Sequence, residues 1–201
     1  VAVPSMAMSG FFAQSFLTRD NYQDLLKDCF QTMKLFGSKV AFLPLGGSGK
    51  DWQQEGCAAY QQMVSRLRTA GEMAKQEGIT IGIRTGMGAK FDKKLLKKVG
   101  SSQIKVYYNF QDAADHHRDI CKELRKLGAQ RIVQIHASNT DSVNLQEDPE
   151  INLPKIRKTL DKMKWSGWLV VERSRDVKRV RDVKYNFGRN IAYLKQVFQE
   201  R

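Results

Sequence analysis

Short apolar runs alternate with amphipathic stretches along the whole chain. The apolar runs cover residues 3–8, 39–43, 80–83, 105–108, 131–135 and 168–171. Their nearly continuous apolar character is typical of parallel strands buried on both faces. Residues 21–36, 60–76 and 112–127 instead place apolar side chains at helical spacing, and a glycine at position 37, 78 or 128 stops each pattern. The alternation predicts a parallel α/β fold, either an open doubly wound sheet or a closed (β/α) barrel.

A nucleotide-binding loop is not supported. No G-x-G-x-x-G follows the first predicted strand, as a dinucleotide-binding fold would require. The loop from Gly46 to Lys50 is rich in glycine, but a phosphate-binding P-loop needs glycine at position 44 and Ser or Thr at 51, where this chain has Pro44 and Asp51. We interpret this loop as a flexible part of an active site.

The segment from Gly167 to Arg175 joins a predicted strand to a charged loop. Residues 168–171 predict a strand covered on both faces, and Glu172 follows it directly. In α/β folds, reacting groups and ligands collect at the carboxyl ends of strands. Glu172 is therefore a candidate catalytic residue, and a structural salt bridge is the alternative.

Other predicted strands also end in hydrogen-bonding or ionisable residues. These are Ser9, Gly46 with Ser48, Arg84, Asn109 and His136. Since parallel strands place their carboxyl ends at one edge of a sheet, the set predicts a polar pocket there.

Four segments resemble the last four strands of the sugar phosphate isomerase/epimerase family: residues 79–85, 104–110, 131–137 and 167–175. Residues 4–10 and 40–45 resemble its third and fourth strands. The resemblance implies a xylose isomerase-like (β/α)8 TIM barrel, shared with abasic-site nucleases. Residues 1–201 would then form a single partial barrel domain with strands three to eight, and the first two βα units would be missing. Either an N-terminal region outside this sequence or a second fragment is expected to cover the open edges.

The resemblance also implies a divalent metal (Mn, Mg or Zn) held by strand-end Glu, Asp, His and Glu side chains. The His corresponds to His136 and the last Glu to Glu172, while Arg84 and Asn109 stand where the family has Glu and Asp. A guanidinium cannot ligate a metal, and a neutral amide is a weaker ligand than a carboxylate. His136, Glu172 and Asn109 remain the candidate metal ligands, and the two replacements argue against tight metal binding.

The same positions define the candidate catalytic and substrate-binding groups. Glu172 is the expected acid or base, and His136 orients or ligates. Arg84, Asn109, Arg175 and Ser9 are expected to contact substrate. The alternatives are a pairing of Arg84 with Glu172 and a hydrogen-bonded core role for His136.

The composition and charge of the chain limit the classes of molecule that it is expected to bind. The 201 residues are 41% hydrophobic with a formal charge of +13, which favours anionic partners. The basic residues lie mostly on helix faces, and the chain has only 3 His, so a nucleic-acid enzyme with several metals is disfavoured. His116 and His117 are expected at the surface. The odd number of cysteines, 3, supports no disulfide framework or zinc knuckle.

The sequence thus predicts a sugar or sugar phosphate isomerase/epimerase. A non-catalytic carbohydrate-binding protein on the same barrel is the first alternative, and an abasic-site nuclease is the second. The expected partner is a small-molecule sugar or sugar phosphate, and a homo-oligomer is left open. No apolar run is long enough for a membrane span. We expect a cytoplasmic protein, with a periplasmic one as the alternative.

Overall fold

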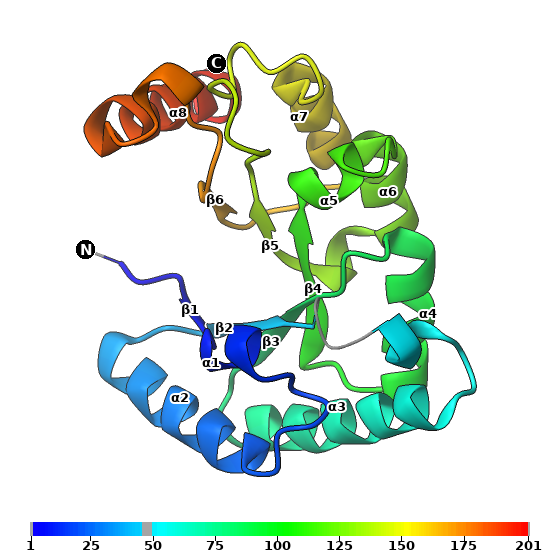
Figure 1. The fold of residues 1–201 in the computed structure, drawn as a ribbon. Helices are drawn as coiled ribbons and strands as arrows, with labels where there is room; N and C mark the ends of the chain where they lie inside the picture. Colours follow the sequence, from blue (N-terminus) through cyan, green and yellow to red (C-terminus); the bar gives the residue numbers. More distant parts are fainter. Residues whose placement is uncertain (1, 46–49, 201) are drawn as a thin grey trace. The chain divides into compact units, whose positions relative to one another are not determined.

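The computed structural model describes residues 2–45 and 50–200 (Figure 1). The chain divides into two compact units, one ending at Tyr107 and the other beginning at Tyr108. Gly46 and Ser48, interpreted above as part of an active-site loop, lie outside the described residues.

The first unit is a parallel sheet with helices between its strands. Its elements are β1 (Ser5–Ala7), α1 (Gly10–Ala13), α2 (Tyr22–Phe36), β2 (Val40–Pro44), the 3-10 turn η1 (Lys50–Gln53), α3 (Ala58–Gln76), β3 (Thr80–Arg84), α4 (Ala89–Val99) and β4 (Ile104–Asn109). The first four strands are ordered as in the chain, and the pairing runs from Val40 opposite Thr80 to Pro44 opposite Arg84. Strand β4 begins in this unit and ends in the second.

The core of the first unit lies between this sheet and helices α2 and α3, which lie side by side along it (Figure 1). Leu43, Ile81 and Leu67 are fully buried there. The glycine that ends α2, Gly37, has a φ of 67°, a left-handed conformation that residues with a side chain rarely adopt. The glycine therefore ends α2 at the position that the apolar pattern indicates, and strand β2 begins a few residues later.

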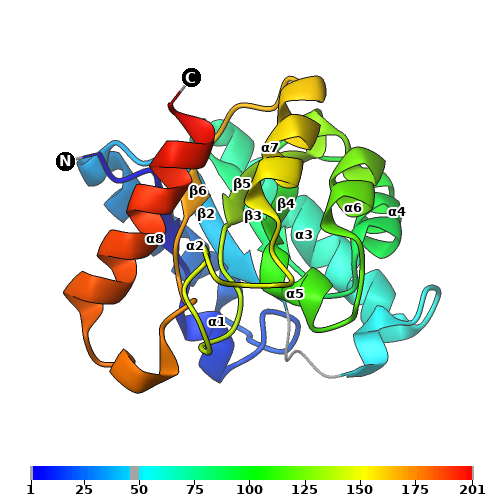
Figure 2. The same ribbon diagram turned by 90° about the horizontal axis from the view of Figure 1, so that it is seen from above.

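The second unit contains α5 (Phe110–Ala114), α6 (Ile120–Leu127), η2 (Ala129–Arg131), β5 (Ile132–His136), α7 (Leu153–Lys162), β6 (Leu169–Val170), η3 (Val177–Arg179) and α8 (Val183–Phe198). Strands β5 and β6 are parallel, with His136 opposite Val170. Helix α7 packs against both α6 and α8, as the view from above shows (Figure 2). Ile135, Leu124 and Leu153 are fully buried in this unit.

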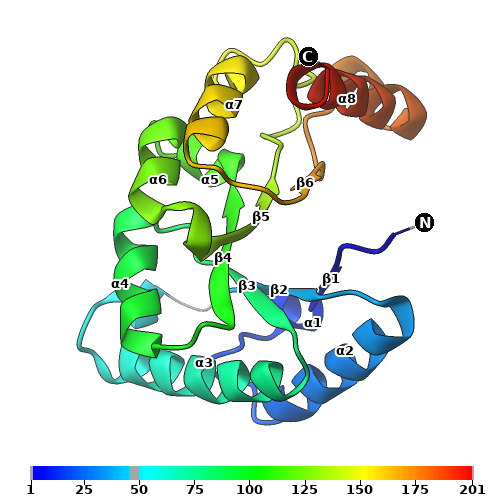
Figure 3. The same cartoon turned by 180° about the vertical axis from the view of Figure 1, so that it is seen from behind.

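Two predictions from the pattern were wrong in detail. The helix predicted over residues 112–127 is broken into α5 and α6, because His117 takes a left-handed φ of 50° and the side chain of Asp119 caps a new helix by accepting from the Lys122 N–H. Residues 168–171 do not form a strand buried on both faces. Strand β6 has only the two half-buried residues Leu169 and Val170, and Trp168 is 53% exposed. The view from behind shows this short strand beside β5 (Figure 3).

The surface position predicted for His116 and His117 was confirmed, since both are exposed. Cys121 is buried among apolar side chains of α6. In the described part of the chain, no helix is both long enough and apolar enough to cross a membrane.

Candidate functional site

Three strand-end residues of the second unit come together around one imidazole. Asn109 is the last residue of β4 and His136 the last of β5, while Glu172 follows β6 after one further residue. His136 Nδ1 lies 3.6 Å from Glu172 Oε2 and 3.5 Å from Asn109 Nδ2. The predicted convergence of these three side chains is therefore present.

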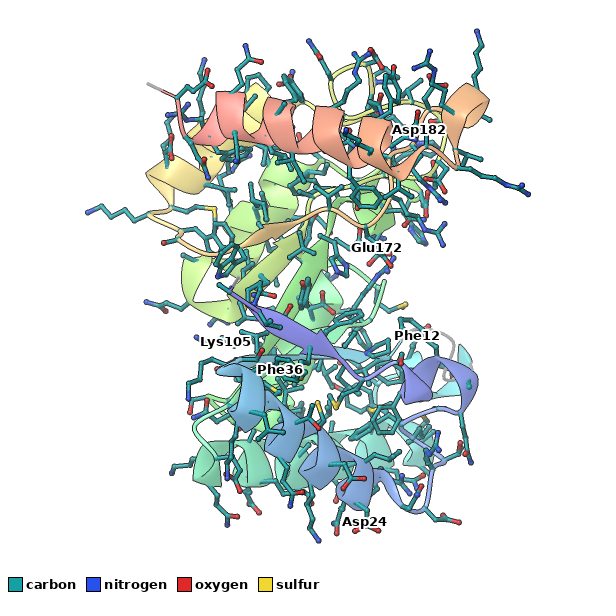
Figure 4. All side chains as sticks on the ribbon, turned by 90° about the vertical axis from the view of Figure 1, so that its left-hand side faces the viewer. Phe12, Asp24, Phe36, Lys105, Glu172 and Asp182 are labelled. Carbon is teal, nitrogen blue, oxygen red and sulfur yellow. The ribbon has the colours of Figure 1, made fainter. Side chains whose placement is uncertain are left out.

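The three side chains differ in their exposure to solvent. Asn109 and His136 are buried, with 2% and 7% of their surface exposed. The side chain of Glu172 is 41% exposed and projects from the segment after β6 (Figure 4). The Glu172 carboxylate is thus the member of the group that a molecule from solvent can reach, and the His136 imidazole contacts it from the buried side.

The partners of His136 Nδ1 depend on its protonation. With the proton on Nε2, Nδ1 is an acceptor and can receive the Asn109 amide N–H. With a proton on Nδ1, the imidazole donates toward the Glu172 carboxylate instead. The 3.6 Å contact therefore brings an imidazole and a carboxylate, two groups able to carry a proton, next to each other.

This geometry accompanies a clear family match. The family model described as "Xylose isomerase-like TIM barrel" matches residues 3–197. The chain belongs to this family. Its fold is the xylose isomerase-like fold, and the described residues contain six of the strands of a barrel that has eight when closed.

Solved structures of the same fold include sugar epimerases. D-psicose 3-epimerase from Clostridium cellulolyticum H10, crystallised with D-tagatose, has a TM-score of 0.72 at 13% identity, over 89% of this chain and 71% of that one. A 3-keto-D-glucoside 4-epimerase from E. coli has a TM-score of 0.75 at 11% identity, over 98% and 80%. An AP endonuclease of family 2 from Brucella melitensis has a TM-score of 0.73 at 15% identity, over 92% and 78%. At these identities the likeness concerns the fold. A search of curated protein sequences found no match.

The divalent ion that the family resemblance implies does not fit the residues present. Asn109 Oδ1 accepts the backbone N–H of Gln111 at 2.8 Å and so caps α5, which fixes the amide with its NH2 group toward His136. An NH2 group cannot ligate a cation. Within the described residues, no group of three or more His, Cys, Asp and Glu side chains could hold a metal. His136 and Glu172 alone are fewer donors than a Zn, Mg or Mn site uses.

Arg175, predicted to contact an anion, is paired with a carboxylate. Its guanidinium donates Nε–H to Asp141 Oδ1 at 2.9 Å and also donates to Oδ2, a two-pronged ion pair. Hydrogen bonds from Arg175 lower the pKa of Asp141, and the same contact raises the pKa of the guanidinium. The pair links the loop after β5 to the loop after β6.

Ser9 and Arg84 lie in the first unit. Arg84 is half-buried at the end of β3, and its carbonyl accepts the Leu45 N–H at 2.8 Å. Ser9 is exposed at the first position before α1 and makes no capping hydrogen bond with its side chain.

The first unit also has a cavity of about 340 Å³ between β1, α1 and α2. Its lining is mainly apolar and includes Met6, Met8, Phe11 and Cys29. Burial raises the pKa of the Cys29 thiol to about 11, so the thiol is protonated at neutral pH. Such a lining suits apolar groups better than a hydroxyl-rich sugar.

Sequence reasoning missed Ser138, Asp141 and Ser174, which shape the site. Ser138 Oγ accepts the Glu172 N–H at 3.4 Å, and Ser174 Oγ accepts the Asn139 N–H at 2.7 Å. A signal was available, because Ser138 to Asp141 are four polar residues that follow the strand ending in His136. Their partners lie more than thirty residues away along the chain, and no local pattern identifies such partners.

Proposed function

We propose that this protein is an isomerase or epimerase of a sugar or sugar phosphate, with its reacting groups at the carboxyl ends of the strands. The main support is the solvent-accessible Glu172 carboxylate, 3.6 Å from the buried His136 imidazole. Family membership and the epimerases among structures of the same fold add to it.

In this proposal Glu172 moves a proton at a carbon atom next to the sugar carbonyl. The C–H bond breaks, its proton passes to the carboxylate, and the electron pair forms an enediolate with the carbonyl. A proton returned from solvent water to the opposite face of the same carbon gives an epimer. A proton returned by Glu172 to the neighbouring carbon, with the hydroxyl proton passing to the former carbonyl oxygen, gives an isomer. His136 orients the carboxylate for this proton transfer. No step passes through a metal, since the donor set does not fit one.

Substrate contacts complete the proposal. Arg84 offers a forked cation suited to a phosphate or carboxylate, and Ser9 offers a hydroxyl at a strand end. Asn109 supports His136 with its amide. Arg175 already donates to Asp141, whose carboxylate offsets the charge of the guanidinium, so its proposed contribution is to hold the loop after β6 beside the substrate.

The test is solvent exchange at carbon. Wild-type protein in D2O, with D-psicose, D-tagatose or their phosphates as probes, is expected to incorporate deuterium next to the carbonyl, followed by NMR. Glu172→Gln should slow the exchange by about 10²-fold or more, since a positioned base contributes about that factor. Glu72→Gln, on the exposed face of α3, is the matched control and should keep the wild-type rate. Exchange at the wild-type rate in Glu172→Gln would refute the role of Glu172.

A non-catalytic sugar-binding protein is the second candidate. Arg84 favours it, because a guanidinium stands where the family resemblance implies the second proton-moving glutamate, and a guanidinium is far too basic to serve as an acid or base. Saturable binding of a sugar by calorimetry, with no deuterium incorporation from any probe, would establish this function instead. An abasic-site nuclease is not favoured, since its chemistry needs several metal ligands.

We also propose that both units belong to one partial barrel domain, because the family match continues across the boundary between them. The three free cysteines agree with a cytoplasmic location, and the periplasm is the alternative. A homo-oligomer is compatible with the proposal and is tested by light scattering.

A further inference from the structure

The loop after β6 is fixed by buried hydrogen bonds that the proposed chemistry does not use. Ser174, two residues after Glu172, is fully buried and has a φ of 72°. A left-handed φ is uncommon for a residue with a side chain and strains the backbone. Such a conformation persists only where surrounding contacts enforce it.

Two asparagine side chains hold the backbone of Ser174. Its carbonyl oxygen accepts from Asn190 Nδ2 at 2.7 Å and from Asn144 Nδ2 at 3.1 Å. Asn190 Oδ1 accepts the Leu145 N–H at 2.9 Å, so one side chain of α8 binds the loops after both β5 and β6. Both asparagines are 1% exposed.

A third asparagine extends this contact one helical turn earlier. Asn186 Oδ1 accepts the Asp176 N–H at 2.8 Å and the Asn144 amide at 3.0 Å. Its Nδ2 donates to the carbonyl oxygens of Arg179 and Asp182, at 2.7 and 2.9 Å. Asparagine is a poor residue for a helix interior, and positions 186 and 190 share one helix face. Both side chains bond to the loop after β6, and Asn186 also donates to Asp182, the residue that caps α8.

Glu172 itself has few restraints. Its backbone N–H makes one long hydrogen bond to Ser138 Oγ, at 3.4 Å, and its side chain is half-exposed. The position of its carboxylate therefore depends on how firmly the following residues are held. Two residues further on, Ser174 is fully buried, and its hydroxyl and carbonyl oxygens accept three hydrogen bonds.

We propose that Asn190, assisted by Asn144, is a positioning residue that holds Glu172 against His136 by fixing the left-handed turn at Ser174. The inference rests on the proposed function for its purpose, because an acid–base group must be held within about 0.5 Å of its working position. The contact between Glu172 and His136 can nevertheless be measured without any substrate.

The experiment follows the ring protons of His136 by NMR, which is practical because the chain has only 3 His. Replacing Glu172 by Gln removes a charge 3.6 Å from Nδ1 and is expected to shift these resonances at neutral pH. In an Asn190→Ala background the same replacement should give less than half of that shift, because Glu172 is no longer held at the ring.

Asn152→Ala is the matched control. It removes the side-chain cap of α7, which accepts the Lys155 N–H at 2.9 Å, so it loosens the same unit without touching the loop after β6. In this background the Glu172→Gln shift should keep its wild-type size. Should Asn190→Ala not fold, Asn144→Ala provides the same comparison through the other donor to Ser174.

An undiminished shift in the Asn190→Ala background, or in the Asn144→Ala one, would overturn the proposal. The proposal would also be overturned if Glu172→Gln, made in the otherwise wild-type protein, left the His136 resonances unshifted. Failure of the proposed function has a different signature, since deuterium exchange would then be absent while the ring-proton shift and its dependence on Asn190 remain. With any sugar that the wild-type protein converts, Asn190→Ala should lower kcat about tenfold or more and leave KM nearly unchanged.

Discussion

His136 Nδ1 has an amide NH2 on one side and a carboxylate on the other. The amide is fixed in that orientation because Asn109 Oδ1 is used by the cap of α5. An aspartate at the same position could cap the helix with one oxygen and present the other to the imidazole. A single atom therefore separates this site from one with a third metal donor.

Asn109→Asp is expected to create a divalent-ion site. Isothermal calorimetry with Mn²⁺ should show at least about tenfold tighter binding than wild type, since a carboxylate joins His136 and Glu172 as a ligand. Asn109→Ser is the control, because a serine can cap α5 while adding no charge. Equal Mn²⁺ affinity in wild type and Asn109→Asp would contradict this interpretation.

The ion pair of Asp141 and Arg175 predicts an acid-dependent stability. Hydrogen bonds from Arg175 lower the pKa of Asp141 below its ordinary value of 3.8. A carboxyl whose folded pKa is depressed stabilises the fold above its unfolded pKa, and this stabilisation is lost as pH falls through the folded value. Asp141→Asn should therefore lower the urea midpoint at pH 7, and the difference from wild type should shrink below about pH 4.

The matched control for this pair is Asp28→Asn, an exposed position on α2. Its urea midpoint should follow wild type at every pH. A constant difference between Asp141→Asn and wild type from pH 7 down to pH 3 would show that the Asp141 carboxylate adds no pH-dependent stability.

At the scale of elements, two helix-interior glycines have opposite surroundings. A Cβ on Gly71, in α3, would lie 2.8 Å from Ser101 Cβ, closer than real Cβ contacts come, and 3.3 Å from Ile104 Cγ1, tighter than most. A Cβ on Gly188, in α8, would meet nothing within 4 Å. The first glycine allows α3 to pack closely on the segment before β4, and the second has no packing role.

Replacing each glycine by alanine is expected to give opposite results. Gly188→Ala should raise the free energy of unfolding by about 0.5–1 kcal/mol, the difference in helix propensity. Gly71→Ala should lower it by about 1–3 kcal/mol, because overpacking outweighs the same propensity gain. Urea denaturation of the pair measures both effects. A stabilised Gly71→Ala protein would mean that Ser101 can move aside freely.

The apolar spacing of the sequence predicts the helices, except where a residue inside a helical pattern caps a new helix instead. Residues 112–127 have helical spacing throughout, yet the left-handed His117 and the cap at Asp119 divide them. The pattern alone does not reveal this, because Asp is also compatible with an exposed helix face. Likewise, the apolar letters of residues 168–171 predict a strand but not which side chains remain exposed.

At the scale of the whole molecule, the charge of +13 is the dominant property. Like charges repel one another more in the compact state than in the unfolded chain, and salt screens this repulsion over about 10 Å at 0.1 M. Individual ion pairs at the surface, such as Lys34 with Glu77, contribute little by comparison.

We therefore expect the melting temperature to rise by a few degrees between about 10 and 200 mM NaCl and to level off beyond that range. Calorimetry at constant pH measures it, with sucrose at equal osmolality as the uncharged control. A melting temperature that falls with salt would mean that attractive pairs outweigh the net repulsion.

By itself, the sequence determined the order of strands and helices, the parallel fold class and the strand ends that carry Asn109, His136 and Glu172, because apolar periodicity and glycine stops are local properties. Only the tertiary structure decided what these residues face. The structure alone shows that Arg175 pairs with Asp141 and that Asn190 binds Ser174, because these partners are distant in the chain. It alone also shows how the Asn109 amide is oriented, because the oxygen of that amide is taken by the cap of α5. Such choices depend on geometry that packing of the whole unit sets, and no local pattern encodes them.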